Sequence, residues 1–260
     1  MRLDKALADL GIGTRKEIRE LVRGGAVTAD GAVVTDPGAG ITEWTVLALY
    51  GRELQRRKNL YYMLNKPAGT VCATADRKLQ TVIDLLPADL PGRKDLFPVG
   101  RLDRDTEGLL LLTNDGVFAH RMISPRKQVN KVYLTLAEGP VTEQTVRAFR
   151  EGIDLPPVTP REDTGYRTLP GELRVLSAGE YETYRARYDL PAEEGGLTPV
   201  LVTIREGKFH QVKRMFHVCG AEVRYLMRLR TGGIELDPAL ARGNCRELTQ
   251  EELDRAFLSE

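Results

Sequence analysis

The sequence has little of what a disulfide-bonded, exported or membrane protein needs. Its three cysteines, Cys72, Cys219 and Cys245, form no C-x-x-C pair, which excludes a disulfide framework. Lys and Arg number 38 against 37 Asp and Glu, so any nucleic-acid surface must come from local clusters of charge. Apolar runs stay below the roughly 18 residues of a membrane span, and Asp4 and Asp9 stand where a signal peptide is apolar. We therefore expect a globular cytoplasmic protein with reduced thiols and no membrane contact.

The first 50 residues have the pattern of two short helices followed by a hairpin. Leu3, Leu7 and Leu10 recur at helical spacing, and Thr14-x-x-Glu17 is a capping box that begins a second helix. Two glycines end that helix, and an Asp-Gly turn between two strand-like runs predicts the hairpin. Basic side chains on the second helix can follow a phosphate backbone, but a solvated helix face explains them equally well. These side chains are Arg15, Lys16, Arg19 and Arg23.

A polar segment, GRELQRRKN at 51–59, interrupts the apolar pattern and predicts a linker, which divides the chain into domains 1–58 and 59–260. Beyond it, strands without one helix between each pair predict an α+β domain with a mainly antiparallel sheet. Residues 178–198 have the weakest pattern and suggest a long hairpin or an inserted loop. The expected strands are 61–64, 109–113, 131–136, 173–176 and 200–204, and the expected helices are 81–86, 117–123, 142–152 and 212–218.

The most informative segment is GRLDRDTEG at 100–108, directly before the apolar run 109–113. It holds Asp103, Arg104, Asp105 and Glu107 between two glycines, and loops at the end of a buried strand often carry catalytic groups. Taken alone, the segment also fits a polar loop with capping acids. A glycosidase pair is a weaker interpretation, because the spacing gives no assured placement of two carboxylates across a sugar.

A second concentration of charge lies at 205–230, with seven basic and two acidic residues. Aromatic and amide side chains among the basic ones suit RNA, where bases are stacked and phosphates are neutralised. The alternative is a basic surface helix with Phe209 in an ordinary core. A zinc site is disfavoured, because His210, His217 and Cys219 match no common ligand spacing.

Taken together, these segments resemble one enzyme family. YMLNKPAGTVCAT at 62–74, GRLDRDTEGLLLLTNDG at 100–116, KVYLTL at 131–136 and EGKFHQVKRMF at 206–216 follow one another as in the RsuA-type pseudouridine synthases of bacterial ribosomal RNA. The first 50 residues resemble the RNA-binding domain named after ribosomal protein S4. The resemblance implies a small S4-like domain followed by a mainly antiparallel-sheet catalytic domain.

The resemblance also implies a reaction and a set of residues. These enzymes isomerise a uridine to pseudouridine without a cofactor or a metal ion. Asp103 matches the essential aspartate, Tyr133 the tyrosine that stacks on the flipped base, and Lys213 the basic partner that keeps the aspartate ionised. We expect Asp105 and Glu107 to brace the loop through local hydrogen bonds. The expected substrate contacts are Leu226 in the pocket and Arg104, His210, Gln211, Arg214, Arg15, Lys16 and Arg19 on the RNA.

The expected partner is ribosomal RNA or a pre-ribosomal particle, bound by a monomer. Within the family, the plain N-terminal domain and short C-terminus favour a 16S rRNA target, with 23S rRNA as the alternative. Two other functions stay open at this point. One is a non-catalytic ribosome-assembly factor that has kept the fold, and the other is an RNA N-glycosidase that uses Asp103.

Overall fold

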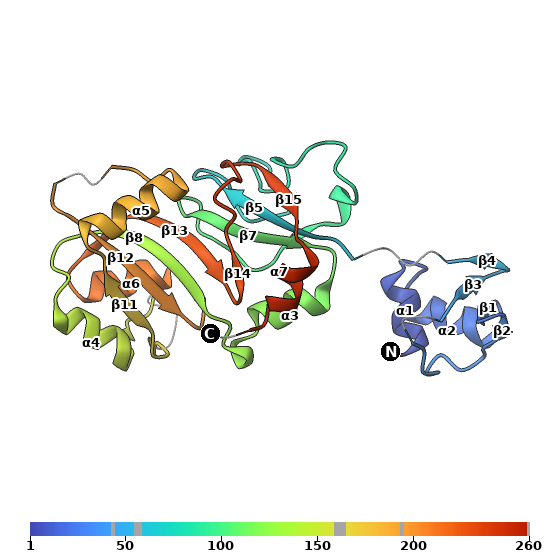
Figure 1. Cartoon of the computed structure of the whole chain (residues 1–260). Coiled ribbons are helices and arrows are strands. Elements are labelled where there is room, and N and C mark those ends of the chain that lie inside the picture. Colours follow the sequence, from blue (N-terminus) through green and yellow to red (C-terminus); the bar gives the residue numbers. More distant parts are fainter. Residues whose placement is uncertain (43–44, 55–58, 159–164, 193–194, 259–260) are drawn as a thin grey trace. The chain divides into compact units, whose positions relative to one another are not determined.

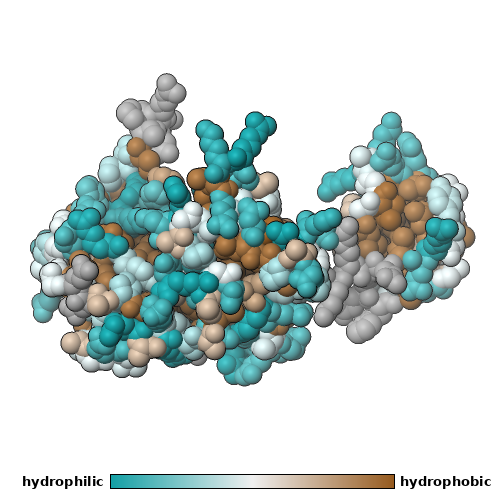
Figure 2. Space-filling model, turned by 90° about the horizontal axis from the view of Figure 1, so that it is seen from above, coloured by the Kyte–Doolittle hydropathy of each residue, from teal (hydrophilic) through white to brown (hydrophobic). Residues whose placement is uncertain are grey.

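The computed structural model describes residues 1–42, 45–54, 59–158, 165–192 and 195–258. The chain separates into two compact units, Met1–Lys58 and Asn59–Glu260 (Figure 1). On the face shown in Figure 2, hydrophilic side chains cover much of each unit, with apolar side chains visible between them. Across the described ranges, no helix is both long and apolar enough to cross a membrane.

The first unit contains the predicted helix pair and hairpin. Helices α1 (Leu3–Asp9) and α2 (Arg15–Arg23) pack on a four-stranded sheet in the order β2-β1-β3-β4. The predicted capping box is confirmed, because Glu17 N donates to Thr14 Oγ1 and Thr14 N donates to Glu17 Oε2. The strands are β1 (Val27–Ala29), β2 (Ala32–Val33), β3 (Leu47–Leu49) and β4 (Arg52–Glu53).

The second unit is built on a nine-stranded sheet with the main order β11-β12-β8-β13-β7-β5-β15. The predicted mainly antiparallel sheet is confirmed: among these strands only β7 and β13 pair in parallel, as Met227 with Glu107 and Arg228 with Gly108. The strands are β5 (Tyr61–Lys66), β6 (Phe97–Pro98), β7 (Glu107–Thr113), β8 (Lys131–Glu138), β11 (Glu172–Val175), β12 (Leu197–Ile204), β13 (Glu222–Thr231), β14 (Ile234–Glu235) and β15 (Cys245–Glu247). A separate two-stranded sheet joins β9 (Asp154–Leu155) to β10 (Tyr166–Arg167).

Helices cover both faces of the large sheet. Because successive strand residues point to opposite faces, Tyr133 packs with α4 (Glu143–Glu151) and α6 (Gln211–Val218), whereas Leu134 belongs to the core on the opposite face. That opposite core includes α3 (Gly116–Ile123), α5 (Ala178–Tyr188) and α7 (Gln250–Arg255). Two short 3₁₀ turns, η1 (Arg93–Asp95) and η2 (Pro125–Lys127), complete the unit.

Two expectations about secondary structure are wrong. Residues 81–86 form turns and not a helix, because Asp84 Oδ2 accepts hydrogen bonds from Thr81 N and Oγ1 and closes the chain locally. Residues 178–188 of the weakly patterned segment form α5, which Ser177 and Glu180 begin with a reciprocal capping box. The side chains of Tyr181 and Tyr188, which lie on this helix, are buried.

The segment 205–230 is a loop, a helix and a strand, so the alternative interpretation as one basic surface helix does not hold. Its second half is β13, which lies in the middle of the sheet. Residues 226–229 are buried on both faces of the sheet, and this removes the simple alternation that marks a half-exposed strand.

Candidate active site

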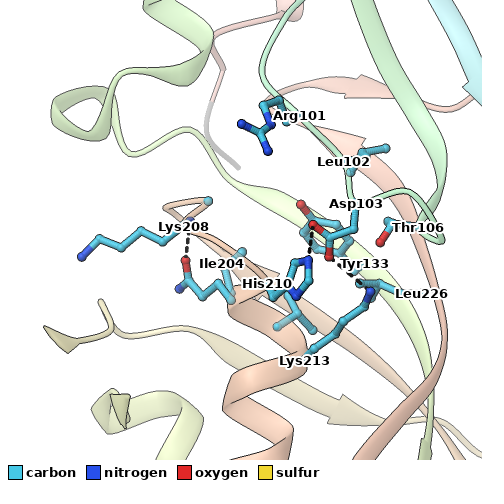
Figure 3. A pocket seen from close by; sticks show the side chains of 13 residues that line it. Arg101, Leu102, Asp103, Thr106, Tyr133, Ile204, Lys208, His210, Lys213 and Leu226 are labelled. Atoms are coloured by element: carbon cyan, nitrogen blue, oxygen red, sulfur yellow. Dashed lines mark hydrogen bonds and ion pairs between the residues drawn. The ribbon is translucent and has the colours of Figure 1, made fainter. Parts of the chain in front are cut away.

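A pocket opens where the loop before β7, the strands of the sheet and the start of α6 meet. The loop supplies the motif residues, the strands supply the floor, and α6 with the turn before it supplies the basic side chains (Figure 3). The sequence motifs at 100–116, 131–136 and 206–216 therefore meet at one place. The lining residues are Arg101, Leu102, Asp103, Thr106, Tyr133, Ile204, Gly207, Lys208, His210, Gln211, Val212, Lys213 and Leu226.

Asp103 carries a carboxylate that faces two side chains of α6 and its cap. Lys213 Nζ lies 3.2 Å from Oδ2 of Asp103, and His210 Nε2 lies 3.6 Å from Oδ1. The Asp103 side chain is 25% exposed, so a ligand in the pocket can reach it. In Figure 3, His210 and Lys213 approach Asp103 from the helix, and Arg101 lies on the other side.

Lys213 also binds the second aspartate of the motif. Its Nζ donates to Asp105 Oδ1 at 2.5 Å, so one ammonium group lies between two carboxylates. Partial burial acts to raise the pKa of Asp105, but the hydrogen bond and charge of Lys213 outweigh it and hold that pKa below its usual value. The expectation that Asp105 only braces its own loop is wrong, because its partner comes from α6.

Tyr133 and Leu226 form the floor of the pocket. Tyr133 lies on β8 and Leu226 on β13, and the two strands pair antiparallel with Leu226 opposite Thr135. Both side chains are buried, with 6% exposure each. Because they lie on one face of adjacent strands, they present an aromatic ring and an aliphatic group to whatever fills the pocket.

The loop that carries Asp103 is held from below by Lys66, which the sequence analysis did not single out. Lys66 is fully buried, and its Nζ donates to the carbonyl oxygens of Pro67 at 3.0 Å, Arg104 at 3.2 Å and Thr106 at 2.8 Å. Burial lowers the pKa of Lys66, and the carbonyl contacts compensate for the lost hydration. A lysine inside the otherwise strand-like run YYMLNK was the available sequence signal, since lysine is seldom buried.

The end of the loop is fixed where the two parts of the sheet join. Gly108 has φ +96°, and a Cβ atom there would lie 2.3 Å from the carbonyl oxygen of Arg228. Glycine is required at this close approach. Next to it, Glu107 Oε2 accepts hydrogen bonds from Tyr225 Oη and Arg242 Nε, both at 2.8 Å. These partners are distant in sequence, so the expectation of purely local hydrogen bonds for Glu107 is wrong.

The other predicted RNA contacts divide into two groups. Gln211 is buried, and its amide is used inside the protein: Nε2 donates to Glu206 Oε1, and Oε1 accepts from Lys208 N. It thus braces the turn before α6 and is not free to bind RNA as expected. Arg104 is exposed and donates to the Gly69 carbonyl, and a guanidinium nitrogen of Arg214 donates to the Pro156 carbonyl.

The predicted basic residues of α2 belong to the first unit. Arg15, Lys16 and Arg19 are exposed on that helix, whereas Ile18 and Val22 enter the core. Within the described part of the chain, no group of three or more His, Cys, Asp and Glu side chains is arranged to hold a metal ion. His217 Nδ1 instead lies 2.5 Å from Glu222 Oε1.

The second unit thus carries an ion pair at an open pocket, which is the kind of site that an enzyme uses. Residues 60–218 match the family model described as RNA pseudouridylate synthase, and residues 1–43 match the S4 domain. The chain belongs to the RNA pseudouridylate synthase family, and it is a pseudouridine synthase of the RsuA type that carries an S4 domain.

Relatives match over nearly the full length of the chain. The uncharacterized RNA pseudouridine synthase YtzG of Bacillus subtilis is 42% identical, with 97% of each chain covered. Ribosomal small subunit pseudouridine synthase A of Escherichia coli is 39% identical, covering 97% of this chain and 98% of the relative. A crystal structure of a pseudouridylate synthase superposes with a TM-score of 0.64 at 33% identity, covering 98% of this chain and 99% of the other.

Proposed function

We propose that this pseudouridine synthase isomerises one specific uridine in the 16S rRNA of the small ribosomal subunit. The observation that carries the proposal is the contact between Asp103 and Lys213, which places an ion pair at a pocket floored by Tyr133. Full-length similarity to enzymes named for the small ribosomal subunit supports the choice of RNA.

The reaction exchanges one bond of the nucleotide for another. The bond between ribose C1′ and N1 of uracil breaks, the base turns while bound, and C1′ joins C5. The proton on C5 is released and N1 takes up a proton, so the mass of the nucleotide is unchanged. Asp103 is the carboxylate that acts on the ribose or the base, and Lys213 is the cation paired with it.

Tyr133 and Leu226 hold the uracil. A uridine in folded RNA must leave its stack before its glycosidic bond can be reached, which costs a few kcal/mol. Stacking on the Tyr133 ring and apolar contact with Leu226 compensate for part of that cost inside a pocket that both side chains already line. The pocket thus binds the flipped base before chemistry begins.

The rest of the RNA is bound by basic side chains. Arg15, Lys16 and Arg19 on α2 contact the phosphate backbone of the ribosomal RNA, free or within a pre-ribosomal particle. Arg104, His210 and Arg214 contact the RNA around the pocket. We propose that the enzyme acts as a monomer.

The test is pseudouridine mapping on total rRNA from cells with and without this protein, followed by incubation of purified protein with unmodified 16S and 23S transcripts. We expect one 16S uridine to lose its modification in the deletion and to regain it in vitro. A site in 23S rRNA would overturn the choice of RNA. An abasic product, visible by its loss of mass, would indicate an N-glycosidase, and no reaction on either transcript or on precursor particles would favour an assembly factor.

A further inference from the structure

Phe209 lies at the rim of the pocket with more than half of its side chain in water. Its exposed fraction is 54%, although it stands between Lys208 and His210, which both line the pocket. The alternative interpretation, which placed Phe209 in an ordinary core, is therefore wrong. Single exposed apolar side chains are common on protein surfaces, so the exposure alone carries no function.

The orientation of the ring distinguishes Phe209 from other exposed apolar residues. Its ring stacks on the imidazole of His210, with a centroid separation of 3.8 Å and an interplanar angle of 15°. His210 in turn lies 3.6 Å from the Asp103 carboxylate. The rings of Phe209 and His210 therefore form a short stack that begins at the reacting carboxylate and ends in solvent.

Two basic side chains of the same segment lie against the ring of Tyr166. Lys208 Nζ lies 3.4 Å from the centroid of the Tyr166 ring, and the guanidinium of Arg214 lies 5.5 Å from the same centroid. These interactions place two positive charges on the segment that carries Phe209, before and after it in sequence. An exposed flat ring on a segment that also carries basic side chains suits a nucleotide, which has a flat base and an anionic phosphate.

We propose that Phe209 is a stacking platform for the base of the nucleotide next to the target uridine. When the uridine turns into the pocket, its neighbour in the RNA loses a stacking partner, and the exposed phenyl ring replaces that partner. Base stacking on an aromatic side chain tolerates any base, so Phe209 contributes affinity without reading sequence. This inference rests on the proposed function, because it requires an RNA uridine in the Asp103 pocket.

The experiment combines a protein change with an RNA change. Single-turnover pseudouridine formation is measured for the wild type and Phe209→Ala over a range of RNA concentrations. The RNA is a synthetic fragment around the mapped uridine, either intact or with an abasic nucleotide on its 5′ or 3′ side. On intact RNA we expect Phe209→Ala to raise the half-saturating concentration by about 5- to 150-fold. On one of the two abasic RNAs the wild type and the variant should give the same value.

Two control variants and one further measurement test the stacking directly. Phe209→Trp restores an aromatic face and should return the half-saturating concentration to that of the wild type. Val218→Ala removes an apolar side chain that is 46% exposed at the end of α6, the helix that follows Phe209, and it should have no effect. Quenching of 2-aminopurine at the contacted position should accompany binding to the wild type and be lost in Phe209→Ala.

Two results would overturn the stacking platform. If Phe209→Ala weakens binding equally on intact and abasic RNA, the ring only positions His210. If the variant binds all three RNAs like the wild type, the ring faces solvent in the complex. Neither result touches the proposed function, since that fails only if the wild type makes no pseudouridine on 16S rRNA.

Discussion

Lys213 Nζ lies 3.2 Å from Oδ2 of Asp103, although the two residues come from α6 and from the loop before β7. The same ammonium lies 2.5 Å from Asp105, so the cation neutralises a pair of carboxylates at the mouth of the pocket. Two carboxylates this close to one site would repel each other without it. Lys213 therefore joins both motif aspartates to α6, and the first two predictions depend on this arrangement.

Replacing Asp103 with Asn should abolish pseudouridine formation and leave RNA affinity within about twofold. The substitution preserves shape and removes only the ionisable oxygen, so the fold should be unchanged. Tritium release from C5-labelled uridine RNA measures turnover, and filter binding measures affinity. Asp89→Asn, at an exposed position outside the pocket lining, is the matched control. Measurable turnover by the pure Asp103→Asn variant would refute the assignment.

Replacing Lys213 with Met should move the acidic limb of the single-turnover pH–rate profile to higher pH. The Lys213 hydrogen bond and charge hold the pKa of Asp105 below its usual value. Their loss raises that pKa, so the Asp105 carboxylate protonates at higher pH. Activity should recover partly as pH rises. Lys213→Arg keeps the charge and should shift the limb far less. A uniform drop in rate with an unmoved limb would assign Lys213 to RNA binding alone.

Replacing Arg15, Lys16 and Arg19 with Gln should weaken RNA binding and flatten its salt dependence. Each lost phosphate contact removes about 0.7 to 0.9 from the slope of log affinity against log salt concentration. The rate of chemistry on saturated enzyme should change little, because these residues lie in the first unit and the pocket in the second. Glu20→Gln on the same helix is the control. An unchanged slope in the triple variant would show that α2 faces solvent in the complex.

Replacing Lys66 with Met should lower the free energy of unfolding by about 1 to 3 kcal/mol. It should also reduce kcat by a larger factor than the loss of folded enzyme explains. The change leaves buried carbonyl groups without the ammonium group that donates hydrogen bonds to them. Two of these carbonyl groups, those of Arg104 and Thr106, belong to the Asp103 loop. Urea unfolding and single-turnover rates at saturating RNA separate the two effects. A stable variant with a normal rate would show that the loop needs no support from Lys66.

Stability should rise with pH between about 8 and 10.5 through the side chain of Lys131. Burial, together with the charge of Arg228, lowers the pKa of Lys131 to about 8, below its ordinary value of 10.5. In this window the unfolded chain binds more protons at this site than the folded one, so raising the pH favours folding. The free energy of unfolding should therefore climb more steeply with pH in the wild type than in Lys131→Met, as urea titrations at several pH values would show. Parallel curves would contradict the lowered pKa.

The sequence alone determined the elements that depend on local signals. Caps and periodicity act within a few residues, so the sequence predicted such elements correctly. Examples are the capping box at Thr14 and Glu17 and the strands at 109–113 and 131–136 that follow the Asp103 loop. A similar capping signal is present at Ser177 and Glu180, but the segment that follows is rich in tyrosine and glycine and lacks a clear apolar stripe. The helix there was therefore not predicted. Motif resemblance supplied the family and the identities of Asp103, Tyr133 and Lys213.

Only the tertiary structure decided how those residues meet. The parallel pairing of β7 with β13 brings the Asp103 loop beside the strand that carries Leu226, and Gly108 allows the two strands to approach closely. No local sequence pattern encodes a pairing between strands so far apart along the chain. The same holds for the buried Lys66, the second partner of Lys213 and the distant partners of Glu107. Each is a contact between groups that are far apart along the chain, so chain packing and not local preference fixes it.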